Sequence, residues 1–358
     1  MLKVSYRENY LRAAKFDYPK FVPVYINIFR PLWNIHGNKL KDVLRKYPTL
    51  FRNQNLDAVR YSDVEGVPYI DKYTTDAFGC VWRTRVEGYI GEVVKHPLDD
   101  WSKFDSFKLP DPELGVPTEN GEPQPIMPWD KIFRMLRKAK ERDQPIIASL
   151  WQHFFFLRLI YLRGFNNLIM DMYRKHEKLY RLIDMLTDYY ISLIRIYKKG
   201  FSSIDIFAFA DDLGAEDKPL ISPRMFKEFI YPSYKKIYSE AKTNGSLVFL
   251  HSDGRIVELW DLLLDTGVDI QYVQDKPNGL ENILKLKGRA CIFLDINRRL
   301  LAFGSPEEVS NYIKQVFEFF KDPRGGFIIK LEFHPPARLE TIDEALKTLN
   351  ELIWIEKT

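Results

Sequence analysis

The sequence predicts an α/β fold, a single (β/α)8 barrel of the TIM type that takes up all of residues 1–358. Short apolar runs recur along the chain, and each ends in polar or glycine-rich residues. The runs are continuous rather than alternating, which is typical of parallel strands covered on both faces. Patterns with helical period separate the later runs, and alternation of strand and helix over this length indicates a barrel.

The apolar runs set the expected strands. We expect eight of them: "FVPVYIN" (21–27), "LDAVRY" (56–61), "PIIASLW" (145–151), "IDIFAFA" (204–210), "SLVFLH" (246–251), "DIQYV" (269–273), "ACIFLDI" (290–296) and "GFIIKLEF" (326–333). From the fourth strand onward the strand–helix units follow at short spacing. No linker, internal repeat or low-complexity tract divides the chain, so one domain is expected.

Two helices carry clear boundary signals. The first is expected from Ser222, with a proline in its first turn, to Gly245, which closes it. The second is expected from Ser305, again followed by proline, and Glu308 stands at the capping-box position. These signals favour helices that cover the outside of the barrel.

A long excursion between residues 62 and 144 fits no simple strand–helix unit. Its first part, "FGCVWRTRVEGYIGEVVKHP", predicts a β-hairpin that turns around Gly88. Its second part, "KLPDPELGVPTENGEPQPIMPW", is rich in proline and glycine and predicts an irregular surface segment.

Composition and charge exclude several classes of protein. The formal net charge is +4 and the basic residues do not form blocks, so nucleic acid is not an expected partner. The two cysteines, Cys80 and Cys291, show no metal or redox spacing, which favours a reducing cytoplasm. The charged start has no apolar core of a secretory signal, and no run reaches the length of a membrane span. We therefore expect a soluble cytoplasmic protein that acts on a small molecule.

Polar residues at the carboxyl ends of the expected strands are the candidate site residues, because barrel active sites lie at that end. Residues two apart on an extended chain point to the same side, which groups His251 with Asp253 and Glu332 with His334. One histidine with carboxylates from neighbouring strands can hold a divalent metal. The alternative is that Asp253 hydrogen-bonds His251 and merely closes the strand.

Other candidates follow neighbouring strands. Asp211 and Asp212 could bind a substrate cation, act as an acid or base, or hold a histidine proton, and for Asp212 a turn-capping role is favoured. Gln274 and Asn297 could orient substrate or serve the structure. Trp151 could line the cleft, although packing against the excursion is the favoured role.

A set of motifs resembles the uroporphyrinogen decarboxylase superfamily, especially its cobalamin-linked methyltransferase branch. The motifs are the "DDLG" turn, the helix that begins "ISPRMFKEFIYP", "HSDG" at a strand end, "GVDIQYVQ", "FGSPEEV" and, upstream, "DAFGCVWR", "GEVVKHPLDDW" and "LRGFNNLIMDM". The resemblance spans nearly the whole chain, and it implies a (β/α)8 barrel with its site at the strand carboxyl ends.

The resemblance also implies what the site contains. Uroporphyrinogen decarboxylases carry an arginine-rich segment near the first strand, whereas "VYINIFRPLWNIHG" has only Arg30. The methyltransferase branch holds zinc through a His-x-Cys pair and a later cysteine. By this resemblance His251 matches the histidine, Asp253 the first cysteine and Glu332 the second, with His334 as a reserve ligand.

Two readings of these replacements stay open. In one, the metal site has decayed and the cleft binds its ligand by hydrogen bonds alone. In the other, His251, Asp253 and Glu332 hold a harder divalent metal, zinc as first choice, that polarises an oxygen.

The leading hypothesis is a methyltransferase that moves a methyl group between a small donor and a corrinoid protein. Its expected catalytic residues are Asp211, His251 and Asp253. Its expected substrate-binding residues are Asp212, Gln274, Asn297 and Trp151. One alternative is a cofactor-free decarboxylase of a porphyrinogen-like or smaller acid, which would use Asp211. The other is a non-catalytic barrel that binds a ligand or a corrinoid protein. A homodimer would be unsurprising for this superfamily.

Overall fold

The computed structural model describes residues 5–51, 69–86, 90–150 and 154–355. The chain divides into two compact units. The first unit comprises residues 1–67, 142–145 and 270–358, and the second comprises residues 68–141 and 146–269.

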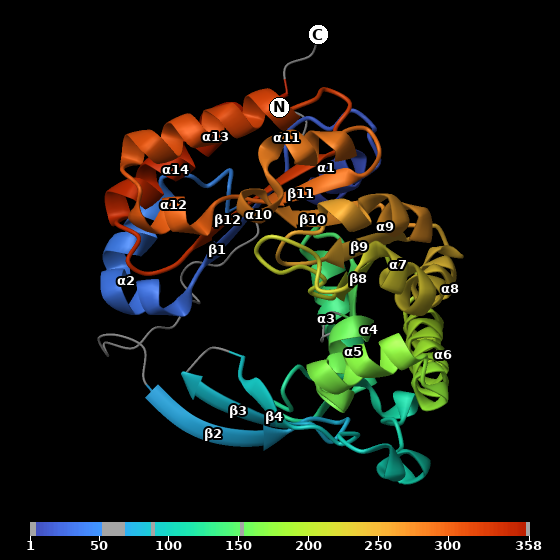
Figure 1. Cartoon of the computed structure of the whole chain (residues 1–358). Helices are drawn as coiled ribbons and strands as arrows, with labels where there is room; N and C mark the ends of the chain where they lie inside the picture. The colour runs from blue at the N-terminus through green and yellow to red at the C-terminus, as the bar shows by residue number, and fades with distance from the viewer. Residues whose placement is uncertain (1–4, 52–68, 87–89, 151–153, 356–358) are drawn as a thin grey trace. The chain divides into compact units, whose positions relative to one another are not determined.

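The first unit contains four parallel strands, in the order β1-β12-β11-β10. Every residue of β11 and β12 is buried, because these continuous apolar runs are covered on both faces. Figure 1 shows α12, α13 and α14 gathered beside β11 and β12. The elements are α1 (Tyr6–Ala14), β1 (Val24–Ile28), α2 (Arg30–Arg45), β10 (Ile270–Gln274), α10 (Asp275–Asn278), α11 (Leu280–Ile283), η6 (Leu284–Leu286), β11 (Cys291–Asp295), α12 (Arg298–Phe303), α13 (Pro306–Phe320), β12 (Phe327–Phe333) and α14 (Leu339–Leu352).

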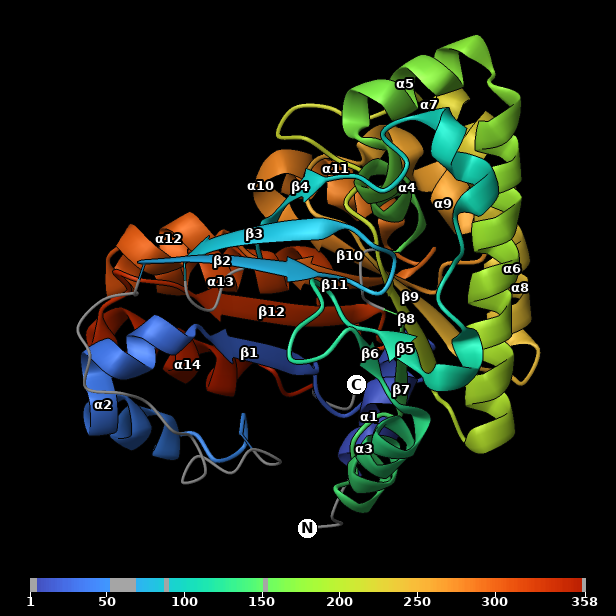
Figure 2. The same ribbon diagram turned by 90° about the horizontal axis from the view of Figure 1, so that it is seen from below.

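The second unit contains three further parallel strands, in the order β9-β8-β7, and an antiparallel sheet β2-β3-β4. Figure 2 shows β2 and β3 side by side, and it shows α6 alongside α8. The strands are β2 (Tyr69–Thr75), β3 (Val81–Val86), β4 (Glu92–Lys95), β5 (Val116–Pro117), β6 (Ile126–Met127), β7 (Ile147–Leu150), β8 (Ile206–Ala210) and β9 (Leu247–His251). The helices are η2 (Trp101–Ser106), η3 (Pro112–Leu114), α3 (Trp129–Glu141), α4 (Phe155–Arg163), α5 (Phe165–Arg174), α6 (Glu177–Gly200), α7 (Pro223–Met225), η4 (Phe226–Ile230), α8 (Tyr231–Lys242), η5 (Val257–Leu259) and α9 (Trp260–Thr266).

Among the described residues seven of the eight predicted strands are present, each within three residues of its expected bounds, and the strands of each unit pair in parallel. The predicted strand at 56–61 lies outside the described residues, so closure of an eight-stranded barrel stays a prediction. The antiparallel strands β3 and β4 flank residues 87–89, where a hairpin turn was expected at Gly88, a residue that is also outside the described ones.

The predicted helix boundaries are confirmed. Ser222 accepts a hydrogen bond from Met225 N, and the chain leaves α8 through Gly245 at φ 79°. Between them Phe226–Ile230 form one π turn, closed by Tyr231 N bonding to Phe226 O. Pro232 follows, and because proline has no N–H to donate, the wider turn is tolerated there.

The second predicted helix, α13, has its capping box. The side chain of Ser305 accepts from Glu308 N, and the side chain of Glu308 accepts from Ser305 N. Within the residues described, no helix combines the length and the apolar character needed to cross a membrane.

One buried carboxyl of the first unit links folding to pH. Asp275 follows β10 and accepts hydrogen bonds from Asn297 N at 2.8 Å and Tyr312 Oη at 2.5 Å. Burial raises its pKa to about 6 and outweighs those hydrogen bonds, which lower it. The folded protein therefore binds this proton more tightly than the unfolded chain does.

We predict that the free energy of unfolding of the wild type, relative to Asp275→Asn, falls by about 3 kcal/mol as pH rises from about 4 to about 7, because the stabilising proton is lost as the pH passes the raised pKa. Urea unfolding of both proteins across this range measures the difference. A difference that is independent of pH contradicts the prediction.

Candidate functional site

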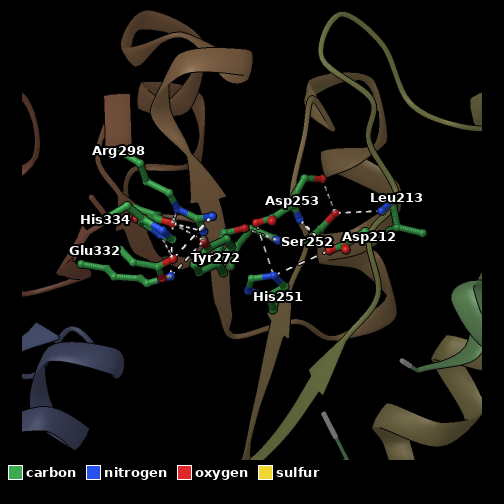
Figure 3. A network of polar contacts seen from close by, with 12 residues as sticks. Asp212, Leu213, His251, Ser252, Asp253, Tyr272, Arg298, Glu332 and His334 are labelled. Carbon is green, nitrogen blue, oxygen red and sulfur yellow. Dashed lines mark hydrogen bonds and ion pairs between the residues drawn. The ribbon is translucent and has the colours of Figure 1, made fainter. Parts of the chain in front are cut away.

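Two loops of the second unit, which follow β8 and β9, are joined by hydrogen bonds. His251 ends β9 and pairs with Ala210, which ends β8. Beyond the strands, Leu213 N donates to Ser252 Oγ at 3.0 Å and Asp253 N donates to Asp212 Oδ1 at 2.9 Å. Figure 3 shows these contacts around the imidazole of His251. The two loops therefore hold each other's polar side chains in place.

Two glycines allow this approach. A Cβ atom on Gly254 would lie 2.3 Å from the carbonyl oxygen of Gly214, and one on Gly214 would lie 2.5 Å from Arg255 N. Gly254 also has φ 77°, a conformation that side chains disfavour. The "DDLG" and "HSDG" turns consequently need glycine because their backbones touch, and Arg255 N closes the contact on Ala215 O at 2.7 Å.

The joined loops bring three potential metal ligands together. Nε2 of His251 lies 3.4 Å from Asp253 Oδ1 and 3.6 Å from Asp212 Oδ1. One ligand atom from each residue lies within 4.8 Å of the others, and in the searched, described part of the chain this is the only such group of three. The side chain of His251 is 14% exposed, whereas those of Asp212 and Asp253 are 41% and 38% exposed. The two carboxylates are therefore partly exposed beside a mostly buried imidazole, and Oδ1 of Asp253, the oxygen that approaches the imidazole, is itself buried.

The donor set fits a divalent cation. It offers one imidazole nitrogen and two carboxylate oxygens, a combination used for zinc and for harder divalent ions. No thiol takes part: Cys80 and Cys291 are buried elsewhere, and burial raises the pKa of both thiols, that of Cys80 to about 12. Three protein ligands leave a coordination position for a substrate or water, as catalytic metal sites require.

Small side chains surround the base of His251. Strand register places Ala210, and then Ala208 with Ser149 of β7, on the same face as the imidazole. Ala208 and Ala210 keep slight exposure, whereas Phe207 and Phe209 on the opposite face have none. Of the two faces of β8, the one on the side of His251 is therefore slightly less covered by the described residues.

Asp211 points away from this group and has a structural role. It is fully buried, and it accepts hydrogen bonds from Phe156 N at 2.6 Å, Leu157 N at 2.7 Å and Tyr234 Oη at 2.6 Å. Burial raises its pKa well above the usual range, against the lowering effect of those hydrogen bonds. The sequence favoured Asp212 as the capping residue, but Asp211 caps α4 and Asp212 lies beside His251.

A second polar cluster lies at the carboxyl ends of β10, β11 and β12 in the first unit. Lys330 is buried and contacts Glu332 Oε2 at 2.5 Å and Asp295 Oδ2 at 3.2 Å. Parallel pairing sets Asp295 beside Lys330, so their side chains share one face of the sheet. Arg298 contacts the same Asp295 oxygen at 2.6 Å, and Tyr272 donates a short hydrogen bond to it. Two cations thus neutralise two buried carboxylates.

Glu332 belongs to this cluster. Burial by itself would raise the pKa of Glu332, but the hydrogen bond with His334 and the charges of Lys330 and Arg298 outweigh it and hold the pKa far below its usual range. Figure 3 shows Glu332 and His334 side by side. Glu332 and His251 belong to different units, so the predicted ligand set His251, Asp253 and Glu332 stays a prediction.

Of the remaining predicted site residues, the structure describes Asn297 and Gln274. Oδ1 of Asn297 accepts from Arg299 N and Leu300 N, both at 3.1 Å, so Asn297 caps α12. Gln274 ends β10 half-buried, and its carbonyl accepts from Asn278 Nδ2 at 2.9 Å. Trp151 lies outside the described residues.

Three members of the second cluster were missed from the sequence. They are Tyr272, Arg298 and Lys330. Lys330 had a usable signal, because it is a charged residue inside the otherwise apolar run "GFIIKLEF" and needs a partner when buried. Tyr272 and Arg298 had none, since either residue is ordinary at its position.

The comparisons with known proteins agree with this architecture. The family model for uroporphyrinogen decarboxylase (URO-D) matches residues 38–352. A methyltransferase from Methanosarcina mazei superposes with a TM-score of 0.65 at 18% identity, over 98% of this chain and 99% of that one. No curated protein matches the sequence.

More distant structures resemble the chain over part of its length. A xylanase from Thermoanaerobacterium saccharolyticum has a TM-score of 0.38 at 12% identity, over 62% of this chain and 76% of that one. The 3-keto-D-glucoside 4-epimerase from E. coli has a TM-score of 0.37 at 9% identity, over 73% and 97%.

We predict that Gly254→Ala destabilises the protein by at least about 2 kcal/mol more than Gly245→Ala does. Both glycines have positive φ, but a Cβ on Gly245 meets nothing within 4 Å, so the control carries only backbone strain. Urea unfolding measures both variants. Equal losses would show that the loops do not touch at Gly254.

We also predict that Lys330→Met lowers the free energy of unfolding by about 3–5 kcal/mol, because it leaves the buried carboxylate of Glu332 without its nearest cation. The control is Lys347→Met, which removes the exposed pair with Glu344 and should change stability by less than about 1 kcal/mol. A small loss in the first variant would contradict the buried ion pair.

Proposed function

Because the chain belongs to the uroporphyrinogen decarboxylase family, we propose that it is a metal-assisted methyltransferase of that family, which moves a methyl group between a small donor and a corrinoid protein. The observation that carries the proposal is the group of Asp212, His251 and Asp253 at the carboxyl ends of adjacent strands. Ligands bind beyond those ends in parallel α/β folds. The methyltransferase neighbour supports the same reaction class.

In this proposal, Asp212, His251 and Asp253 hold the cation, with zinc as the first choice. A bound divalent ion supplies Lewis acidity, which suits an oxygen of a methyl ether or a carbonyl. Asp212 takes the third place that the sequence assigned to Glu332, since its Oδ1 lies 3.6 Å from the imidazole nitrogen and Glu332 is engaged by Lys330 and His334.

The residues of the chain have separate tasks around the cation. Asp253 N donates to Asp212 Oδ1 and fixes that carboxylate. The hydrogen bond from Leu213 N to Ser252 Oγ holds the loops after β8 and β9 together. The ligand geometry is therefore set by backbone contacts that exist before any ion or substrate arrives, which lowers the cost of ordering the site.

The decarboxylase alternative has less support. It assigned the stabilisation of a charged intermediate to Asp211, but both oxygens of that carboxylate accept hydrogen bonds from α4 and Tyr234 inside the core. This burial and these hydrogen bonds favour a structural role for Asp211 over a role at the substrate. The non-catalytic alternative predicts a protein without stoichiometric bound metal, so metal analysis distinguishes it from the proposed methyltransferase.

We predict that the purified protein, supplied with zinc and dialysed, retains about one zinc ion per chain. Replacement of Asp212, His251 or Asp253 by alanine should weaken retention at least about tenfold, because each removes one of three ligands. Metal analysis of the dialysed proteins measures this directly and needs no substrate.

Two variants serve as controls. Asp217→Ala removes an exposed carboxylate of the same loop and should leave zinc retention unchanged. Glu332→Gln should also retain zinc, and loss of zinc in that variant would restore Glu332 as a ligand. A wild type that retains no divalent metal would overturn the proposed function.

A further inference from the structure

His334 follows β12 and forms a dyad with Glu332. Its Nε2 lies 2.7 Å from Glu332 Oε1, a distance typical of a charge-assisted hydrogen bond. One face of the imidazole stacks on Phe29, with ring centroids 4.7 Å apart and planes 26° apart. The ring is therefore fixed both by a hydrogen bond at one nitrogen and by packing on one face.

Two cations stabilise the ionised form of the carboxylate in this dyad. Its Oε2 contacts Lys330 Nζ at 2.5 Å, and Arg298 lies 3.6 Å from Oε1. An ionised carboxylate only accepts hydrogen bonds, so His334 must donate through Nε2. In the neutral ring the other nitrogen, Nδ1, then carries a lone pair and accepts.

That second nitrogen is available to a ligand. Within the described part of the chain, no hydrogen bond is made to Nδ1 of His334, and its side chain is 25% exposed. His176 differs, because its Nδ1 accepts from Lys178 N and caps a helix. The position of His334, just beyond the carboxyl end of β12, is where ligands of parallel α/β folds bind.

We propose that His334 is a ligand-binding residue, which accepts a hydrogen bond through Nδ1 from a hydroxyl group, and that Glu332 is the positioning residue that fixes its tautomer. The ligand class is a small alcohol or phenol, the demethylated counterpart of a methyl ether. Calling that ligand a substrate rests on the proposed function, whereas the hydrogen bond to His334 forms without a metal.

The tautomer is measured first, by long-range 1H–15N correlation spectra of 15N-histidine-labelled protein treated with EDTA at pH 8. The chain has six histidines, and the signal absent from His334→Gln assigns the residue. We expect a protonated Nε2 and a bare Nδ1, with a mixture of tautomers in Glu332→Gln. A protonated Nδ1 in the wild type would overturn the inference.

Ligand binding is measured in the same metal-free samples by titration with phenol and with anisole, which differ in the O–H group. We expect phenol to shift the Nδ1 resonance of His334 saturably and several times further than anisole, while the His176 signals stay in place. Equal shifts, or none, would overturn the inference. Because EDTA removes the metal, the phenol titration gives its answer whether or not the protein binds zinc. A negative titration likewise leaves the result of the zinc analysis unchanged.

Discussion

The backbone contact between the loops after β8 and β9 is the constraint on which the candidate metal site depends. The carbonyl of Gly214 lies where a side chain on Gly254 would stand, and only glycine at both positions permits that approach. Once the loops touch, Asp253 N is within reach of Asp212, and His251 lies between the two carboxylates. The ligand set is thus a consequence of main-chain packing rather than of the side chains' own attraction, since two carboxylates by themselves repel.

The cluster in the first unit solves a different problem. Buried charges are costly unless they are paired and hydrogen-bonded, and Lys330 with Arg298 supplies the pairing for Asp295 and Glu332. Buried ion pairs in general add little net stability compared with apolar residues of the same size, so we look for another use of these charges. A fixed anion next to His334 sets which imidazole nitrogen accepts, and that property is useful to a binding site.

Each unit carries one of the two clusters. In the proposed function Asp212, His251 and Asp253 bind a cation, and in the further inference His334 accepts a hydrogen bond from a hydroxyl group. Both lie at carboxyl ends of parallel strands, the end at which this kind of fold places its chemistry.

The sequence by itself determined seven of the expected strands, the caps of two helices and the polar residues that end the strands, because apolar runs and capping signals are local properties of the chain. Lys330 was missed, although a charged residue inside the apolar run "GFIIKLEF" was a usable signal. Only the tertiary structure decided between Asp211 and Asp212, which are neighbours in sequence: one caps α4 and the other lies beside His251. Consecutive residues point in different directions, and which direction leads to the site depends on strand pairing and loop contacts that join residues far apart in the chain.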